Sequence, residues 1–145
     1  MKYTLLMTAG LFCLAACGGT SEEGTNTEAG LKSDCLIIAA DPEGVEEITE
    51  MGTDANGFCD CVVASVDGIS DEDAEAVKYV MASVAAEMGE TGGSADDIVG
   101  AMMRDSMANP DSEKAEMIQS GVSTVGNIFD DIGDGFDENG SCPAT

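Results

Sequence analysis

The stretch Cys59-Asp60-Cys61 governs how this chain is expected to fold, because it places two cysteines one residue apart near the start of a helical pattern. A disulfide within this pair would close a very small ring with strained geometry, so the two cysteines are not expected to bond to each other. On an α-helix, residues two apart lie about 200° apart around the axis, and the two sulfur atoms would leave on nearly opposite sides. We therefore expect each sulfur to bond to a cysteine elsewhere in the chain.

The partners available to this pair are Cys35, upstream, and Cys142, close to the end of the sequence. Four cysteines allow three pairings, and excluding a bond within the pair leaves two. In both of these, Cys35 takes one member of the pair and Cys142 takes the other. Each bridge is expected to contribute about 2–4 kcal/mol to the stability of a small domain.

A redox-active Cys-x-Cys site is the alternative interpretation of the same pair. Such a site needs a thiol with a lowered pKa, which a helix N-terminus or a nearby cation provides. The intervening residue is Asp60, and no lysine or arginine lies between Lys32 and Lys78. A single close pair of cysteines in a chain without histidine is also unlike zinc motifs. Structural bridging is favoured, and an envelope thiol–disulfide protein using Cys59 and Cys61 is the alternative.

The N-terminus has the organisation of an export signal. The apolar run from Leu5 to Ala16 is too short for an ordinary membrane span but suits the hydrophobic region of a signal peptide. It ends in Leu14-Ala15-Ala16-Cys17, which resembles the lipobox of bacterial lipoproteins. The resemblance covers residues 1–17 only and implies that Cys17 carries lipid after the signal peptide, residues 1–16, is removed. An ordinary secretory signal cut near the same point is the alternative.

This resemblance implies a location in the bacterial cell envelope. Acyl chains on Cys17 would anchor the protein to a membrane, since two or more chains hold a protein stably on a bilayer. By analogy with sorting in enterobacteria, Gly18 after the lipidated cysteine implies the outer membrane, with the protein facing the periplasm. An exported, oxidising location agrees with the disulfides expected around Cys59 and Cys61.

The chain is small and strongly acidic, with 145 residues, 29 acidic side chains against five basic ones and a formal net charge of −24. This length suits one domain with a modest core. The scarcity of lysine and arginine argues against nucleic acid as a partner and against electrostatic docking on anionic lipid. A solvated surface suited to a salty habitat is the favoured interpretation of this charge, with cation binding or a basic protein partner as the alternatives.

Helical patterns follow one another through most of the chain. Residues 17–33 are rich in Gly, Ser, Thr and Glu and are expected to form a flexible acidic tether, which leaves residues 34–145 as the folded domain. Within the domain, the expected helix starts are at Asp41-Pro42, Asp54, Ser70 and Ser94. The expected helix ends are at Gly52, Gly68, Gly89 and Asn109-Pro110. Helices are expected at 42–51, 54–67, 71–88, 94–108 and 111–132, preceded by a short helical segment at 35–40. The pattern predicts an all-α, single-domain bundle of about five helices, cross-linked by two disulfides.

The last expected helix carries an apolar seam with residues spaced three and four apart. Its members are Ala115, Ile118, Val122, Val125, Phe129 and Ile132. This spacing suits packing against neighbouring helices, so core is favoured over a surface that binds a partner. Gly133 is expected to end the helix, and an acidic, glycine-rich tail is expected to return Cys142 to the bridge.

The densest group of oxygen donors lies where that helix is expected to end. It comprises Asp130, Asp131, Asp134 and Asp137. Calcium prefers such ligands, but the stretch fails the EF-hand pattern because Ile132 and Ser141 occupy its third and twelfth positions. A hydrated helix end is favoured, with calcium at these four residues as the alternative and no other cofactor expected.

No catalytic grouping stands out. The chain has no histidine, which excludes histidine-based dyads and triads, and it has no phosphate-binding loop. Met102, Met103 and Met107 would suit copper(I), although methionine at helical spacing more often fills a core. We expect a non-enzymatic envelope lipoprotein that acts through protein or cation contacts. A periplasmic divalent-cation-binding module is the alternative from another class.

Overall fold

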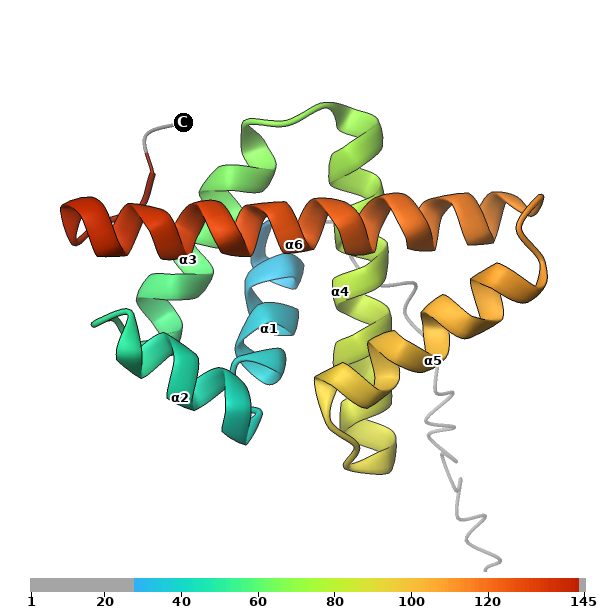
Figure 1. The fold of residues 1–145 in the computed structure, drawn as a ribbon, viewed down its shortest axis with the longest axis horizontal. Coiled ribbons are helices and arrows are strands. Elements are labelled where there is room, and N and C mark those ends of the chain that lie inside the picture. Colours follow the sequence, from blue (N-terminus) through green and yellow to red (C-terminus); the bar gives the residue numbers. More distant parts are fainter. Residues whose placement is uncertain (1–27, 144–145) are drawn as a thin grey trace, which may run out of the picture.

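The computed structural model describes residues 28–143, which fold into six α-helices (Figure 1). They are α1 (Glu28–Ile38), α2 (Pro42–Glu50), α3 (Ala55–Asp67), α4 (Asp71–Thr91), α5 (Ala95–Ala108) and α6 (Glu113–Asn139). The expected all-α single domain with two disulfides is confirmed. The signal peptide and Cys17 lie outside the described residues. None of these six helices is long and apolar enough to cross a membrane.

Capping side chains define where most helices begin, as the sequence indicated. Each capping oxygen accepts a hydrogen bond from a backbone N–H in the first turn, which satisfies a donor that has no partner within the helix. These residues are Asp41, Asp54, Ser70, Ser94 and Ser112. The last of them places the start of α6 at Glu113, two residues after the expected start.

The first helix begins earlier than expected. Residues 28–33 were assigned to the tether, but α1 starts at Glu28 and includes them. Leu31 and Cys35 lie one turn apart on this helix, and both are buried. Their burial against the domain holds the first turns in helical form, although the local composition favours a flexible segment.

The last helix ends later than expected. Gly133 does not end α6, which continues to Asn139, where Gly140 adopts a φ of 65° and donates its N–H to the Phe136 carbonyl at 2.9 Å. In α4, Gly92 rather than Gly89 has this left-handed cap geometry, with a φ of 68°. A glycine ends a helix only where the backbone actually turns into the left-handed region.

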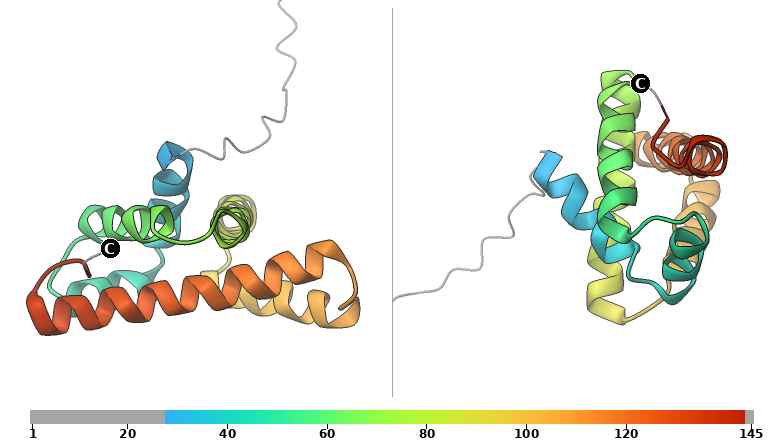
Figure 2. Two further views of the ribbon diagram at one scale, coloured as in Figure 1. Left: turned by 90° about the horizontal axis from the view of Figure 1, so that it is seen from above. Right: turned by 90° about the vertical axis from the view of Figure 1, so that its left-hand side faces the viewer.

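Helix α6 crosses the other elements and joins the two halves of the domain. Figures 1 and 2 show it lying along one side of the molecule, across α3 and α4, while α2 and α5 lie under opposite ends of it. At the crossing with α4, a Cβ atom on Gly121 would overlap the Ala76 carbonyl oxygen and the Val80 side chain. Glycine therefore allows the two backbones to approach each other closely at this point.

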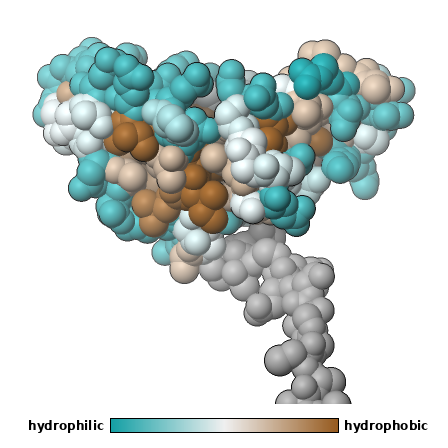
Figure 3. Space-filling view, turned by 90° about the horizontal axis from the view of Figure 1, so that it is seen from below, coloured by the Kyte–Doolittle hydropathy of each residue, from teal (hydrophilic) through white to brown (hydrophobic). Residues whose placement is uncertain are grey.

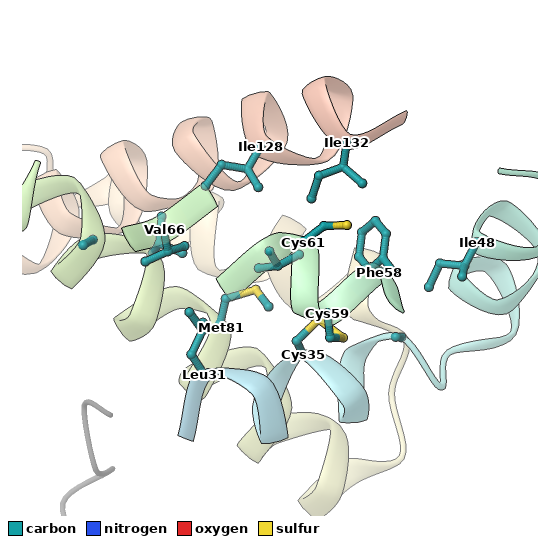
Figure 4. Close-up of a cluster of buried hydrophobic side chains, with 14 residues drawn as sticks. Leu31, Cys35, Ile48, Phe58, Cys59, Cys61, Val66, Met81, Ile128 and Ile132 are labelled. Atoms are coloured by element: carbon teal, nitrogen blue, oxygen red, sulfur yellow. A yellow bond between two sulfur atoms is a disulfide. The ribbon is translucent and has the colours of Figure 1, made fainter. Parts of the chain in front are cut away.

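The main core lies where α1, α3, α4 and α6 meet (Figure 4). Figure 4 shows Leu31, Val66, Met81, Ile128 and Ile132 directed toward a common interior that also contains the cysteines of α3. A second, smaller cluster formed by Val80, Val84 and Ile98 lies between α4 and α5. The α5 end of the domain is thus packed separately from the disulfide-bonded end.

Candidate functional site

Two disulfides connect both ends of the described chain to α3. Cys35 bonds to Cys59, with their Cα atoms 5.8 Å apart, and Cys61 bonds to Cys142, with Cα atoms 5.5 Å apart. The pairing that the sequence left open is therefore settled. Figure 4 shows the first bond on the α1 side of α3 and Cys61 on the side facing α6. The two sulfur atoms leave α3 in different directions, as helix geometry requires.

The cysteine pair on α3 is not accessible in this oxidised form. Cys59 is 0% exposed and Cys61 is 1% exposed, and both are disulfide-bonded. Only Cys142, at the other end of the second bond, is exposed. The geometry is that of a structural cross-link, in which the exposed cysteine belongs to the tail rather than to the Cys-x-Cys pair.

Asp60, between the two cysteines, forms an ion pair with Lys32 of α1. The pair lies on the surface of the same α1–α3 interface that the Cys35–Cys59 bond crosses. An exposed ion pair contributes only about 0–1 kcal/mol to stability. This contact accounts for one of the few lysines in the chain and adds little to the connection that the Cys35–Cys59 bond and the core packing make between α1 and α3.

One hollow of the described domain is a groove of about 260 Å³ between α2 and α5, which we call the acidic groove. Figure 3 shows hydrophobic residues gathered in the middle of the face that α2 and α5 border, with hydrophilic surface around them. The groove is lined by Ile38, Asp41, Glu43, Gly44, Glu47, Val80, Met81, Val84, Ala95, Asp96, Val99, Val125 and Phe129. Its apolar floor comes mainly from α4 and α6, and its carboxylates come from α2, the residue before it, and α5.

The carboxylate of Asp41 fixes the two sides of the acidic groove to each other. One oxygen accepts the Glu43 N–H at 3.1 Å and caps α2, and the other accepts the Ala95 N–H at 3.1 Å, at the start of α5. Asp41 is only 7% exposed. The sequence predicted the cap on α2 but not the bond to α5, because nothing local to Asp41 signals a partner 54 positions away.

Three further carboxylates, those of Glu43, Glu47 and Asp96, are exposed around the acidic groove. No lysine or arginine lines it, and the one ion pair within residues 28–143 is Lys32–Asp60, on another face. A concave apolar surface surrounded by unneutralised carboxylates attracts cations more strongly than an isolated surface acid does. Part of the acidic charge of the chain therefore lies beside apolar surface at this groove.

Helix α6 contributes both to the core and to the acidic groove. Of the expected apolar seam, Ala115, Ile118 and Ile132 are buried, whereas Val125 and Phe129 are only partly buried and line the groove. Phe129 also makes an edge-to-face contact with Phe58, with ring centroids 5.1 Å apart. The groove floor is thus supported from behind by the main core.

A second cavity of about 70 Å³ lies beneath α2, next to the acidic groove. Four residues line both spaces: Ile38, Gly44, Glu47 and Phe129. In α2, Ile48 is buried and Val45 is 50% exposed, so this short helix contributes one core side chain only. Its position therefore depends strongly on the Asp41 contacts.

The structure does not assemble the acidic residues that the sequence suggested as a calcium site. Asp130, Asp131, Asp134 and Asp137 are all exposed on α6, which was expected to have ended at Gly133. Asp130, Asp134 and Asp137 share one face of α6 but are spread along its axis over about 10 Å, at about 1.5 Å per residue, so they do not surround one ion. Within residues 28–143, no group of three or more His, Cys, Asp or Glu residues is arranged to hold a metal.

The methionines are divided between core and surface. Met102 packs against the small cluster between α4 and α5, whereas Met107 is 67% exposed near the end of α5.

Comparisons with protein families, with curated proteins and with solved structures found no match to this chain. The function is therefore argued from the groove, the disulfides and the N-terminal sequence.

Proposed function

We propose that this protein is a lipid-anchored, non-enzymatic protein of a bacterial envelope that binds a positively charged partner in the acidic groove. The observation that carries the proposal is the combination of an apolar floor with carboxylates on both α2 and α5 and no basic residue in the lining. A ligand with an apolar part and a positive charge finds both of its features matched there.

The chemistry of the groove favours binding over catalysis. Its side chains are aliphatic, aromatic or carboxylate, and the chain has no histidine. The cysteines of residues 28–143 are all in disulfides, so this part of the chain supplies no thiol nucleophile. Nucleic acid is a poor match for a groove whose charged residues are all acidic.

The N-terminal sequence supports membrane attachment through Cys17. Ten residues, 18–27, separate this cysteine from the start of α1. A chain of that length reaches at most about 36 Å, at roughly 3.6 Å per residue. The domain would then act close to the membrane surface, and the disulfides agree with an exported location.

Lipidation is tested by mass spectrometry of the protein purified from membranes. The expected N-terminal residue is an acylated Cys17, and Cys17→Ser is expected to release the protein from the membrane fraction. An unmodified Cys17 in the membrane-derived protein would remove the anchor from the proposal.

Binding is tested with three small probes that share one aromatic group and differ in charge. An arylalkyl ammonium ion is expected to bind more tightly than the corresponding neutral alcohol, and the corresponding carboxylate is expected not to bind. Combined Glu43→Gln and Glu47→Gln substitutions should weaken ammonium binding about three- to tenfold, since exposed charge pairs contribute up to about 1 kcal/mol each. Equal binding of the three probes would contradict the proposal.

A further inference from the structure

We infer that the acidic groove recognises a polypeptide segment in which one apolar side chain is flanked on both sides by lysine or arginine. The inference rests on the proposed function, which it makes specific. It follows from the size of the groove, from the placement of its carboxylates and from the fixed geometry of its two sides.

The size of the groove suits a single anchoring side chain. Its volume of about 260 Å³ lies just below the range of about 300–1,000 Å³ that is usual for sites enclosing drug-sized molecules. Protein interfaces, in contrast, often depend on one or two apolar side chains inserted into a pocket at the centre. The floor formed by Val84, Val99 and Phe129 provides such a pocket.

The carboxylates lie on both sides of that pocket. Glu43 and Glu47 are one turn apart on α2, and Asp96 is in the first turn of α5. Figure 1 shows these helices on opposite sides of the lower face of the molecule. A single cationic group reaches only one side, whereas a peptide with basic residues before and after its apolar anchor reaches both.

The two acidic sides are held in a fixed relationship before any ligand binds. Asp41 bonds to backbone N–H groups at the start of α2 and of α5, and it is buried. A preformed site avoids the cost of ordering its own helices during binding. The negative charge of the whole chain adds long-range attraction for a basic segment.

The experiment uses the oxidised full-length protein in detergent micelles and a series of dye-labelled peptides of equal length. The first peptide carries one phenylalanine flanked by two lysines on each side. The second has glycine in place of phenylalanine, the third has glutamine in place of the lysines on one side, and the fourth has glutamine on both sides. Fluorescence anisotropy measures the Kd of each at low and at physiological salt.

The first peptide is expected to bind at least tenfold more tightly than the second or the third, and the fourth is expected to bind most weakly. Glu43→Gln combined with Glu47→Gln should remove the gain in affinity that lysines on one side of the phenylalanine provide. Asp96→Asn should remove the gain in affinity that lysines on the other side provide. The matched control is Glu46→Gln combined with Glu50→Gln, which makes the same charge change on α2 outside the groove and should leave all affinities unchanged.

A bulky variant, Val99→Trp, is expected to fill the pocket and abolish the preference for phenylalanine over glycine. If this variant fails to fold by circular dichroism, the doubly reversed Glu43→Lys, Asp96→Lys protein serves instead. It should lose the preference for lysines over glutamines that the parent protein shows.

Different results separate this inference from the proposed function. Equal binding of the first and third peptides would overturn the two-sided recognition while leaving a cation site in place. Tighter binding of the arylalkyl ammonium ion than of the first peptide would identify a small amphiphile as the ligand and also overturn the inference. Failure of every cationic probe to bind would overturn the proposed function itself.

Discussion

The side chain of Asp41 accepts the backbone N–H of Ala95 at 3.1 Å, which joins two helices that are far apart in sequence. The same side chain caps α2, so one buried carboxylate determines where α2 begins and how far it lies from α5. The width of the acidic groove thus depends on a residue that contributes little exposed surface of its own.

We predict that Asp41→Ala destabilises the domain by about 1–3 kcal/mol, because it removes a helix cap and leaves a partly buried N–H of α5 without its side-chain partner. Urea unfolding followed by circular dichroism measures the change. Asp54→Ala is the control, since Asp54 is exposed and caps α3 only, and it should cost about 0.5–2 kcal/mol. If Asp54→Ala lowers the stability more than Asp41→Ala does, the bond to α5 is unimportant.

Gly121→Ala should destabilise the fold by about 1–3 kcal/mol, because a methyl group there forces α6 away from α4. Gly126 provides a matched control on the same helix, where an added Cβ meets nothing within 4 Å. Gly126→Ala should stabilise the protein by about 0.5–1 kcal/mol through helix propensity. Thermal unfolding measures the melting temperature, which should fall for Gly121→Ala and rise for Gly126→Ala. A shift in the same direction for both variants would contradict the close approach of α6 and α4 at Gly121.

The two disulfides should differ in how easily they are reduced. Cys142 is exposed, whereas both sulfur-bearing residues of the other bond are buried, at 1% and 0% exposure. Brief treatment of the native protein with a mild thiol, followed by alkylation and mass spectrometry, is expected to label Cys61 and Cys142 first. First labelling of Cys35 and Cys59 would show that local opening of α1, rather than exposure, controls access.

The same bonds should also contribute differently to stability. They close stretches of 24 and 81 residues, for which loop entropy predicts about 3.5 and about 4.5 kcal/mol. Replacing each pair by serines and measuring urea unfolding tests this order. A larger loss of stability from replacing Cys35 and Cys59 would indicate that burial of that bond in the core matters more than the length of the loop it closes.

Partial burial raises the pKa of Asp34 above its ordinary value of 3.8. The folded state therefore binds this proton more tightly than the unfolded state does, and the resulting stability is present below pH 3.8 and lost as the pH rises through the folded pKa. Asp34→Asn should consequently stabilise the protein at pH 7, and this gain should disappear in acid.

Asp131→Asn is the control for Asp34→Asn, because it removes one exposed negative charge from a chain with a large excess of them. Urea unfolding between pH 3 and pH 7 compares the two variants with the parent protein. If the stability difference between the two variants is the same across this range, then burial of Asp34 is not the cause.

Much of the fold follows from local signals that are physically specific. A serine or aspartate that accepts a backbone N–H acts over two or three residues, so Asp54, Ser70 and Ser94 were identified correctly as helix starts. Helix ends were less predictable because a glycine can also lie inside a helix, as Gly89 does in α4 and Gly133 does in α6. Gly135, inside α6, would bring a Cβ to 3.0 Å from Pro143, and its role is packing rather than termination.

The acidic groove was outside the reach of sequence reasoning. Its floor combines residues of α4, α5 and α6 whose local patterns indicate ordinary core positions, as for Val125 and Phe129. Only the tertiary arrangement leaves these two side chains partly uncovered beneath Glu47 and Asp96. The disulfide partners were limited to two choices by helix geometry, and selecting between them required the positions of α1 and the tail.

The attachment of α1 to the centre of the molecule has a mechanical consequence. If the chain is held at Cys17, tension from the membrane enters the domain at Glu28 and passes along α1 to Cys35. From there a covalent bond carries the load directly into α3. Force on such an anchor would therefore be taken up at Cys35, before the chain reaches Asp41 and α2.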